Sequence, residues 1–441
     1  MYKPIAGSTN RYHVTARLHE NNENTGVTTG SLTLYCSTNG CAGSSPGSFT
    51  TVLTRTQRLA TDVVQCGLSG YSTVVLEADV TLPLGRWTLS ITEQNRPFAI
   101  RNITESSYSN LYLEAFLDNS SGLVNSSPQF TAYKLPYLSG NQVHQYSSSA
   151  FDIDGDSLVY QLVAPLQGGQ QAPLLPCATP ISSFLPAPHF QINAATGALT
   201  TTAAALVQGD FILPVRVDEY RRINTVWTKI GSVTRDQLYR AYNSSNLNPT
   251  FTGLTVNNST TSQGVEQAIR VNPGQTVALT LTAADPDPSQ TLRFISNTPD
   301  IVPGATFQTL NATQARLTWN VPSSLPLGRY RLTVAVADNG CPVNASEVRT
   351  ITLLVTNQVL ATSQRRPLYL PASPNPFREE VSFRLAAPQS VMIVDGLGRT
   401  VEHLTSRPDG TVTWKPAATV SPGLYVGRTA DGRQLVRLVR E

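Results

Sequence analysis

Tyr330-Arg-Leu-Thr-Val-Ala-Val-Ala-Asp338 is the clearest strand candidate of the sequence, because large apolar residues occupy every second position of this stretch. That period of two is typical of a β-strand with one buried face. Helical periodicity is nearly absent elsewhere, and only the stretch from Thr234 to Tyr242 is expected to form a helical turn. Further strand candidates recur at the short spacing of β-sandwiches, at 31–35, 73–82, 86–92, 112–117, 158–163, 211–217, 276–282, 329–336 and 350–355. The sequence therefore predicts an all-β protein built of tandem β-sandwiches.

The composition suits short strands joined by turns. Charged residues make up 14% of the chain, against roughly 25% in an average soluble protein. Gly and Pro, 29 and 30 residues, break helices and mark turns, and a hydrophobic fraction of 40% suffices for a buried core. The net charge of +3 is spread along the chain, so no nucleic-acid partner is expected.

An internal repeat divides the middle of the chain. Four anchors recur in the same order at similar intervals: Ser127–Phe130 with Asn248–Phe251, Ala150–Asp154 with Ala283–Asp287, Phe190–Asn193 with Phe307–Leu310, and Phe211–Asp218 with Tyr330–Asp338. Together with the polar stretches between them, they predict domains at 1–122, 123–245 and 246–357. A linker at 358–370 and a terminal domain at 371–441 follow.

The five cysteines predict little pairing. Cys36 and Cys41 flank Ser-Thr-Asn-Gly, a turn composition, so a small disulfide loop is expected there, with isolated thiols as the alternative. The spacing does not match a zinc ribbon, which needs two close pairs.

The sequence predicts no transmembrane segment. No stretch reaches the about eighteen uninterrupted apolar residues of a transmembrane helix. No signal peptide precedes the first strand candidate at Arg11, so we interpret Met1 as an internal methionine or a misassigned start.

The repeats resemble bacterial cadherin-like modules of the immunoglobulin type. The resemblance is carried by the stretch from Tyr330 to Pro342, which is similar to the penultimate cadherin strand and its turn, and by Phe190-Gln-Ile-Asn-Ala-Ala-Thr-Gly197. Residues 1–245 also resemble the N-terminal region of large surface proteins from gliding Bacteroidetes, through Asn110-Leu-Tyr-Leu-Glu-Ala115 and the stretch from Asp154 to Tyr160. The implied fold is a row of immunoglobulin-like sandwiches with a role in adhesion.

The last segment resembles the C-terminal sorting domain of type IX secretion. Ala372-Ser-Pro-Asn-Pro-Phe377 opens it, Val391-Met-Ile-Val-Asp395-Gly-Leu-Gly398-Arg399 follows, and Pro422-Gly423-Leu-Tyr425 precedes the final strand. The residues matching the sorting signal are Pro374, Asn375, Pro376, Asp395, Gly398, Arg399, Gly423 and Tyr425. The resemblance implies export across the outer membrane by the type IX machinery, cleavage by a sortase, and release or attachment at the outer-membrane surface.

The sequence motif that most resembles a catalytic site does not meet the requirements of one. Gly43-Ser44-Ser45-Pro46-Gly47 matches the letters of a serine-hydrolase nucleophile elbow. Pro46 has no backbone N–H to donate to an oxyanion, and no helix follows. No catalytic residue is therefore predicted, and the protein is expected not to be an enzyme.

The strongest candidate site is the acidic stretch Asp152-Ile-Asp154-Gly155-Asp156. Three carboxylates this close repel one another unless a cation or solvent compensates them, and their hard oxygen donors suit Ca²⁺. The cadherin resemblance implies a calcium set of Asp118, Asp152, Asp154 and Asp218, repeated more weakly as Asp285, Asp287 and Asp338. A solvated turn is the alternative.

These observations favour a non-enzymatic, secreted or surface protein that acts in adhesion or as a spacer. Its partners would be the export machinery and a surface glycan or protein. An accessory carbohydrate-binding protein is the alternative, and exposed aromatic side chains near Tyr71, Trp87 or Tyr108 would favour it.

Overall fold

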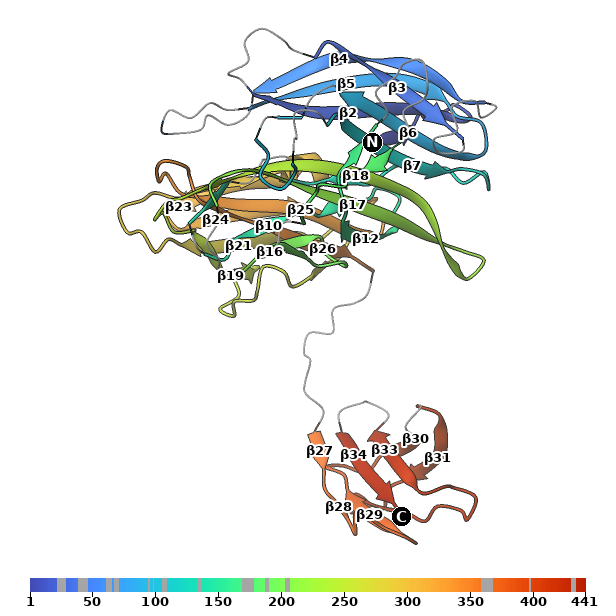
Figure 1. Cartoon of the computed structure of the whole chain (residues 1–441). Coiled ribbons are helices and arrows are strands. Elements are labelled where there is room, and N and C mark those ends of the chain that lie inside the picture. Colours follow the sequence, from blue (N-terminus) through green and yellow to red (C-terminus); the bar gives the residue numbers. More distant parts are fainter. Residues whose placement is uncertain are drawn as a thin grey trace. The chain divides into compact units, whose positions relative to one another are not determined.

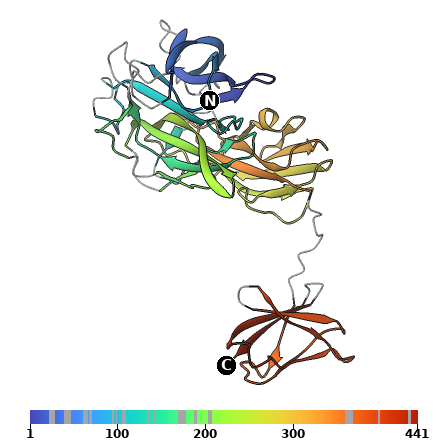
Figure 2. The ribbon, with the colours of Figure 1, turned by 90° about the vertical axis from the view of Figure 1, so that its right-hand side faces the viewer.

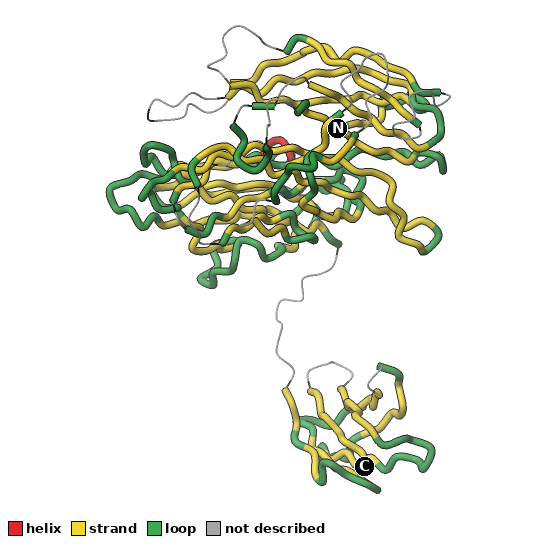
Figure 3. The backbone as a smooth tube through the Cα atoms, in the orientation of Figure 1, coloured by secondary structure: helices red, strands yellow, loops and turns green. Residues whose placement is uncertain are grey.

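The computed structural model describes the chain except residues 22–28, 39–46, 61–65, 67–70, 94–95, 98, 105–108, 133–136, 141, 169–177, 187–189, 203–206, 358–367, 396–397 and 430–433. Strands dominate, and the only helix among the described residues is α1 (Thr298–Ile301), a single turn (Figure 3). No described helix is long and apolar enough to cross a membrane. The all-β prediction is confirmed, and the chain forms two compact units, Met1–Asn357 and Gln358–Glu441.

The N-terminal region of the first unit is one curled antiparallel sheet, seen at the blue end of the chain in Figure 2. Its strands pair in the order β1-β2-β5-β4-β3-β6-β7. In β3 the alternation of the sequence places Leu32, Leu34 and Cys36 on the buried face. The bounds are β1 (Tyr2–Pro4), β2 (Arg11–Asn21), β3 (Ser31–Ser37), β4 (Phe49–Ala60), β5 (Tyr71–Thr81), β6 (Arg86–Glu93) and β7 (Leu111–Asp118).

The next region, which we call the second module, joins this sheet directly. Strand β7 bonds to β18, so the sheet continues through β17 and β12 and the boundary predicted at 122 falls within a shared layer. The bounds are β8 (Gln129–Phe130), β9 (Tyr137–Ser139), β10 (Gln145–Ser147), β11 (Ala150–Phe151), β12 (Ser157–Leu162), β13 (Leu166–Gln167), β14 (Thr179–Pro180), β15 (Phe190–Ile192), β16 (Ala198–Thr201), β17 (Gly209–Ile223) and β18 (Val226–Tyr242).

The third module is a sandwich of two four-stranded sheets, β19-β21-β24-β23 and β20-β26-β25-β22. Trp319 is fully buried between them and donates its Nε1–H to the carbonyl of Pro303. The bounds are β19 (Thr250–Val256), β20 (Ile269–Val271), β21 (Thr276–Ala284), β22 (Arg293–Ser296), β23 (Thr306–Asn311), β24 (Gln314–Asn320), β25 (Gly328–Ala337) and β26 (Ser346–Val355).

The two modules share one pattern of strand pairing, drawn in green and orange in Figure 1. Strand β17 lies between β12 and β18 as β25 lies between β22 and β26. Strands β9 and β20 each run parallel to the last strand of their module. In the third module β21 bonds to both β19 and β24, whereas the second module divides this strand into β11, paired with β8, and β10, paired with β16.

The helical turn expected from Thr234 to Tyr242 is wrong, because these residues form the second half of β18. Each residue from Thr234 to Ala241 pairs with a residue of β17, from Arg216 opposite Thr234 to Gly209 opposite Ala241. Pairing along a neighbouring strand outweighs a weak local preference for helix.

The second unit is a small sandwich with its own core. Sheets β27-β34-β33-β30-β31 and β28-β29-β32 pack around Trp414, which is fully buried between Phe377 and Tyr425. The bounds are β27 (Leu368–Leu370), β28 (Ala372–Ser373), β29 (Val381–Arg384), β30 (Ser390–Asp395), β31 (Thr400–Thr405), β32 (Thr411–Trp414), β33 (Gly423–Thr429) and β34 (Gln434–Arg440).

The cysteines pair differently from the expectation. Cys66 and Cys341, 275 residues apart, form a disulfide that ties the N-terminal region to the third module. Cys36 is a free, buried thiol on β3, so it does not form the expected bond with Cys41, which itself lies outside the described residues. Alternation along β3 directs the Cys36 side chain into the core of the sheet, away from solvent.

Candidate metal centre at the module junctions

The acidic turn lies between β11 and β12 of the second module. Gly155 adopts a left-handed backbone with φ of 81°, and the Asp156 N–H donates to Asp152 Oδ1 over 3.0 Å. Oxygens of Asp152, Asp154 and Asp156 gather within 4.8 Å of one another. The turn thus concentrates three carboxylates.

The segment that leads into the module is tied to this turn. The Ser126 N–H donates to Asp154 Oδ2 over 2.6 Å. One residue earlier, Asn125 Nδ2 donates to Glu219 Oε2 on β17 over 2.7 Å. The junction between the first sheet and the second module is therefore held by acids of the module itself.

Asp152 and Glu219 form the buried centre of the site. Glu219 is fully buried and Asp152 is 7% exposed, and their side chains interact. Burial, reinforced by the neighbouring Asp152 charge, raises the pKa of Glu219, and burial also raises the pKa of Asp152. When both are ionised, Asp152 Oδ2 and Glu219 Oε1 have no donor, because carboxylate oxygens can only accept.

Glycine makes room for this pair. Gly231 on β18 lies directly opposite Glu219, and a Cβ atom at this position would collide with Glu219 Oε2 and with the hydroxyl of Tyr2. The absent side chain therefore lets the acid lie against the sheet.

Asp156 has its own partner. Arg221 Nε donates to Asp156 Oδ1 over 2.7 Å and Nη2 donates to Oδ2 over 2.5 Å. The same guanidinium also bonds the carbonyl of Val124 and Asn125 Oδ1. Arg221 thus neutralises one carboxylate of the turn and fixes the junction segment at the same time.

Two of the predicted ligands have other partners. Asp218 precedes Glu219 on β17 and, by alternation, faces the other side of the sheet, where Lys229 Nζ lies 2.6 Å from Oδ1 and Gln161 Nε2 lies 2.6 Å from Oδ2. Asp118 pairs with Arg86 Nε over 2.9 Å and accepts two bonds from Ser120. Neither belongs to the carboxylates gathered at the turn.

Sequence reasoning therefore missed Glu219, although a signal was present. Asp338 lies eight residues beyond Tyr330, and eight residues beyond Phe211 is Glu219 rather than Asp218. Strand pairing agrees, because Tyr160 lies opposite Val217 as Phe294 lies opposite Val336, and the acid two residues beyond each valine is Glu219 or Asp338. Equal counting between the repeat copies would have found this acid.

The third module repeats the arrangement with Asp285, Asp287 and Asp338. The Leu247 N–H donates to Asp287 Oδ2 over 2.9 Å, and Asn246 Nδ2 donates to Asp338 Oδ2 over 3.1 Å. Asn246 and Leu247 thus take the places of Asn125 and Ser126. Asp285 Oδ2, like Asp152 Oδ2, is buried without a donor.

Asp338, directly after β25, accepts more hydrogen bonds than Glu219 does. Asp338 Oδ1 accepts from the N–H groups of Gly340 and Ala345 over 3.0 and 2.9 Å. Burial raises the pKa of Asp338 to about 6 although these bonds oppose the shift. Of the three acids here, only Asp285 has a buried oxygen that lacks a donor.

The donor set of the second module fits a hard cation. Two buried oxygens, on the interacting side chains of Asp152 and Glu219, lack a donor, and Asp154 lies beside Asp152 at the surface. Carboxylate oxygens are the ligands that Ca²⁺ prefers. The third module offers one such oxygen and fits less well.

The residues matching the sorting signal shape the turns of the second unit. Asn375, between Pro374 and Pro376, donates to the Arg437 carbonyl and accepts from the Val439 N–H, both over 2.8 Å. Asp395 binds the Arg399 side chain over 2.8 Å across a turn in which Gly398 has φ of 78°. Tyr425, two residues into β33 from Gly423, donates its hydroxyl to the Ser421 carbonyl over 2.5 Å.

Among the described residues, the remaining sequence candidates give no second site. Trp87, one of the aromatics that could mark a glycan site, is 2% exposed and donates Nε1–H to the Pro83 carbonyl. Tyr71 is half-buried, and Ser45 and Tyr108 lie outside the described residues. Trp227 is 61% exposed at the tip of the β17–β18 hairpin, a position that sequence reasoning did not single out.

Comparison with known proteins finds only distant structural likenesses. No protein-family model matches the chain, and no curated protein matches its sequence. Human protocadherin-24 EC1-2 is 15% identical, covering 54% of this chain and 100% of that chain with a TM-score of 0.17. The titin domains z1z2 in complex with telethonin are 14% identical, at 54% and 100% coverage and a TM-score of 0.17. Drosophila N-cadherin EC1-3 is 9% identical, at 70% and 99% coverage and a TM-score of 0.19. The assignment to immunoglobulin- and cadherin-like β-sandwiches therefore rests on the strand pairing and not on these likenesses.

Proposed function

We propose that the protein is a non-enzymatic surface protein that acts in adhesion or as a spacer, with calcium bound at the junction before its second module. The observation that carries the proposal is the repeated junction, in which an Asn and the following N–H bind two acids of the module they precede. A device that fixes successive modules suits a protein whose task is to hold or space surfaces.

Asp152 and Asp154, whose oxygens lie within 4.8 Å of each other, would hold the calcium ion together with Glu219, whose side chain interacts with Asp152. Calcium, when bound, supplies the positive charge that relieves the repulsion between these carboxylates. Asp154 and Glu219 also bind Ser126 and Asn125, so the residues that would hold the ion are those that hold the junction. Asp156 contributes less, because Arg221 already pairs with it.

Melting with and without chelator tests the calcium part of the proposal. An ion that binds only the native state stabilises by about 2.7 kcal/mol at ~100 times its Kd. We expect the first unit to melt several degrees lower in chelator, and Mg²⁺ at the same concentration to restore less of the difference. A melt that is insensitive to calcium would contradict the proposal.

The second unit would serve export. Its support is the resemblance to type IX sorting domains and its independent core around Trp414. In a bacterium with this secretion system, residues 358–441 fused to a periplasmic reporter should carry it to the surface. The same reporter without the fusion should stay in the periplasm. Equal surface labelling of the two reporters would contradict the export role.

A second candidate function is accessory carbohydrate binding. Trp227 at 61% and Val226 at 63% exposure form an apolar tip on the β17–β18 hairpin, and an exposed indole can stack on a sugar ring. Trp227→Ala should then abolish retention on a glycan array without changing the melt. Retention that survives this substitution would exclude the hairpin tip as the glycan site.

A further inference from the structure

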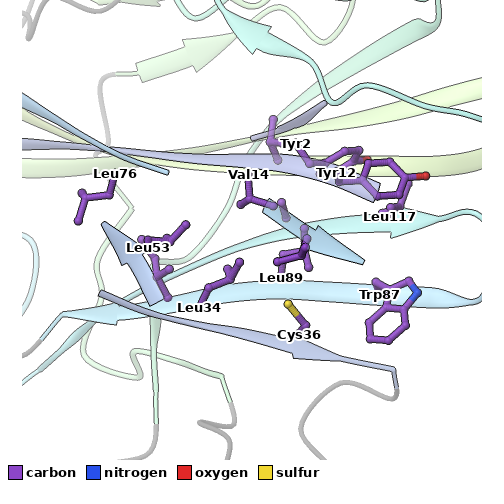
Figure 4. Close-up of a cluster of buried hydrophobic side chains, with 14 of the residues drawn as sticks. Tyr2, Tyr12, Val14, Leu34, Cys36, Leu53, Leu76, Trp87, Leu89 and Leu117 are labelled. Atoms are coloured by element: carbon purple, nitrogen blue, oxygen red, sulfur yellow. The ribbon is translucent and has the colours of Figure 1, made fainter. Parts of the chain in front are cut away.

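A cavity of about 140 Å³ lies in the first unit between the inner face of the N-terminal sheet and strand β18. Its apolar wall is made by side chains from β2, β3, β4 and β6, which converge in Figure 4. These side chains are Val14, Leu34, Leu53 and Leu89. The cavity belongs neither to the acidic turn nor to the junctions.

One wall of the cavity is polar and incompletely bonded. Gln237 on β18 is 1% exposed, and neither its Oε1 nor its Nε2 has a hydrogen-bond partner. Arg235 lies on the same face of β18, and its Nη2 also lacks a partner, while Nη1 donates to the Ala132 carbonyl. Buried polar groups are almost always bonded, so the unbonded atoms of Gln237 and Arg235 at one cavity indicate a missing polar group.

The charge at this wall favours an anion. Arg235 is held over the ring of Phe130 at 5.6 Å, and Arg17 lines the same cavity. Burial lowers the pKa of His19 to about 4, which leaves it neutral. Asp236 pairs with Arg96 over 2.6 Å, so its charge is already compensated.

Glu114 is the remaining acid near the cavity. Burial raises its pKa, and its charge interacts with Arg216 and Lys229. Among the described residues that line the cavity, neither Glu114 nor Asp236 forms an ion pair with Arg235.

We propose that this cavity binds a small amphipathic carboxylate. The guanidinium of Arg235 and the Nε2–H of Gln237 would donate to the carboxylate, and the apolar part would lie against the leucine side chains. An apolar cavity of ~150 Å³ holds a benzene ring, which limits the ligand to about six to ten non-hydrogen atoms. Gln237 Oε1 would accept from a hydroxyl group of the ligand or from a water bound with it.

Fluorine NMR and calorimetry on the full chain test this site with 4-fluorobenzoate as the probe. Benzyl alcohol and benzylamine are matched controls with a neutral and a cationic head. We expect 4-fluorobenzoate to bind at least tenfold more tightly than benzylamine. Equal binding of the three probes would show that the cavity does not recognise a carboxylate, and no binding at millimolar concentration would mean that water alone fills it. Either result would overturn the proposal.

Gln237→Leu separates ligand binding from structure. It removes the unbonded amide at similar volume, so the melting temperature should hold or rise while affinity for 4-fluorobenzoate falls at least tenfold. Gln308 is an exposed residue on β23, and the control variant Gln308→Leu should change neither the melting temperature nor the affinity. Unchanged affinity in Gln237→Leu would contradict the assigned contact. Ala16 on β2 also lines the cavity, so Ala16→Phe should fill it and abolish binding. If this variant does not fold, Gln237→Leu still decides.

Discussion

The junctions before the second and third modules are built from equivalent residues, but their buried carboxylates receive different numbers of hydrogen bonds. At the first junction, Glu219 accepts a bond from Asn125 and has a second buried oxygen without a donor, beside Asp152. At the second junction, Asp338 accepts three bonds, from Asn246, Gly340 and Ala345. One fold thus builds a carboxyl pair that needs a cation or a proton, and a related carboxyl that the backbone already satisfies.

The two junctions are also fastened differently. Arg221 binds both the acidic turn and the segment before the second module. At the third module, the disulfide from Cys66 to Cys341 fixes the loop that follows Asp338. We infer that the third module depends on a covalent bond where the second depends on charge.

The largest effect should come from the disulfide. Replacing both Cys66 and Cys341 by Ser should lower the free energy of unfolding of the first unit by about 5 kcal/mol, because the bond closes a loop of 275 residues in the unfolded chain. Denaturant unfolding measures this change. A reductant should destabilise the natural chain to the same extent and leave the Ser variant unaffected. A loss below roughly 1 kcal/mol would contradict the inference that the third module depends on this disulfide for its stability.

Arg221→Gln should have the next largest effect. It leaves Asp156, whose side chain is 4% exposed, without its cation. Removing one partner of a buried ion pair costs about 3 kcal/mol. The double variant Arg221→Gln with Asp156→Asn should recover most of that loss, because no unpaired charge remains. A full loss in the double variant would place the role of Arg221 in its bonds to Val124 and Asn125.

A smaller effect is expected from acid at the second junction. Burial lowers the pKa of His144 to about 4, and Asn248 Nδ2 lies 3.0 Å from its Nδ1. The folded state binds the proton more weakly than the unfolded state, so stability is complete above about pH 6.5 and falls as the pH drops. By about pH 5 the loss should reach roughly 2 kcal/mol. His144→Gln should flatten this part of the pH profile, and an unchanged profile would exclude His144 as its source.

Much of the fold followed from alternation along the sequence. The repeat anchors and the strand from Tyr330 were sufficient to predict tandem β-sandwiches, because a period of two directs one face of each strand inward. The error from Thr234 to Tyr242 arose where local preference is weak and pairing with β17 decides the structure.

The site was predicted only in part. The acidic turn was readable because its residues are adjacent in sequence, and equal counting in the repeat would have indicated Glu219. Asn125 and Arg221 gave no local signal, since their role depends on how the junction folds back on the turn. The pairing of Cys66 with Cys341 likewise depends on contacts between regions 275 residues apart.

Calcium titration of three chains decides whether Glu219 or Asp218 is a ligand of the ion. In isothermal calorimetry, the natural chain and Asp218→Asn should show the same tightest site, because Asp218 faces Lys229 and Gln161 rather than the turn. Glu219→Gln should lose that site yet fold at least as well in chelator, since the new amide can donate to Asp152. Loss of the site in Asp218→Asn with retention in Glu219→Gln would contradict the account.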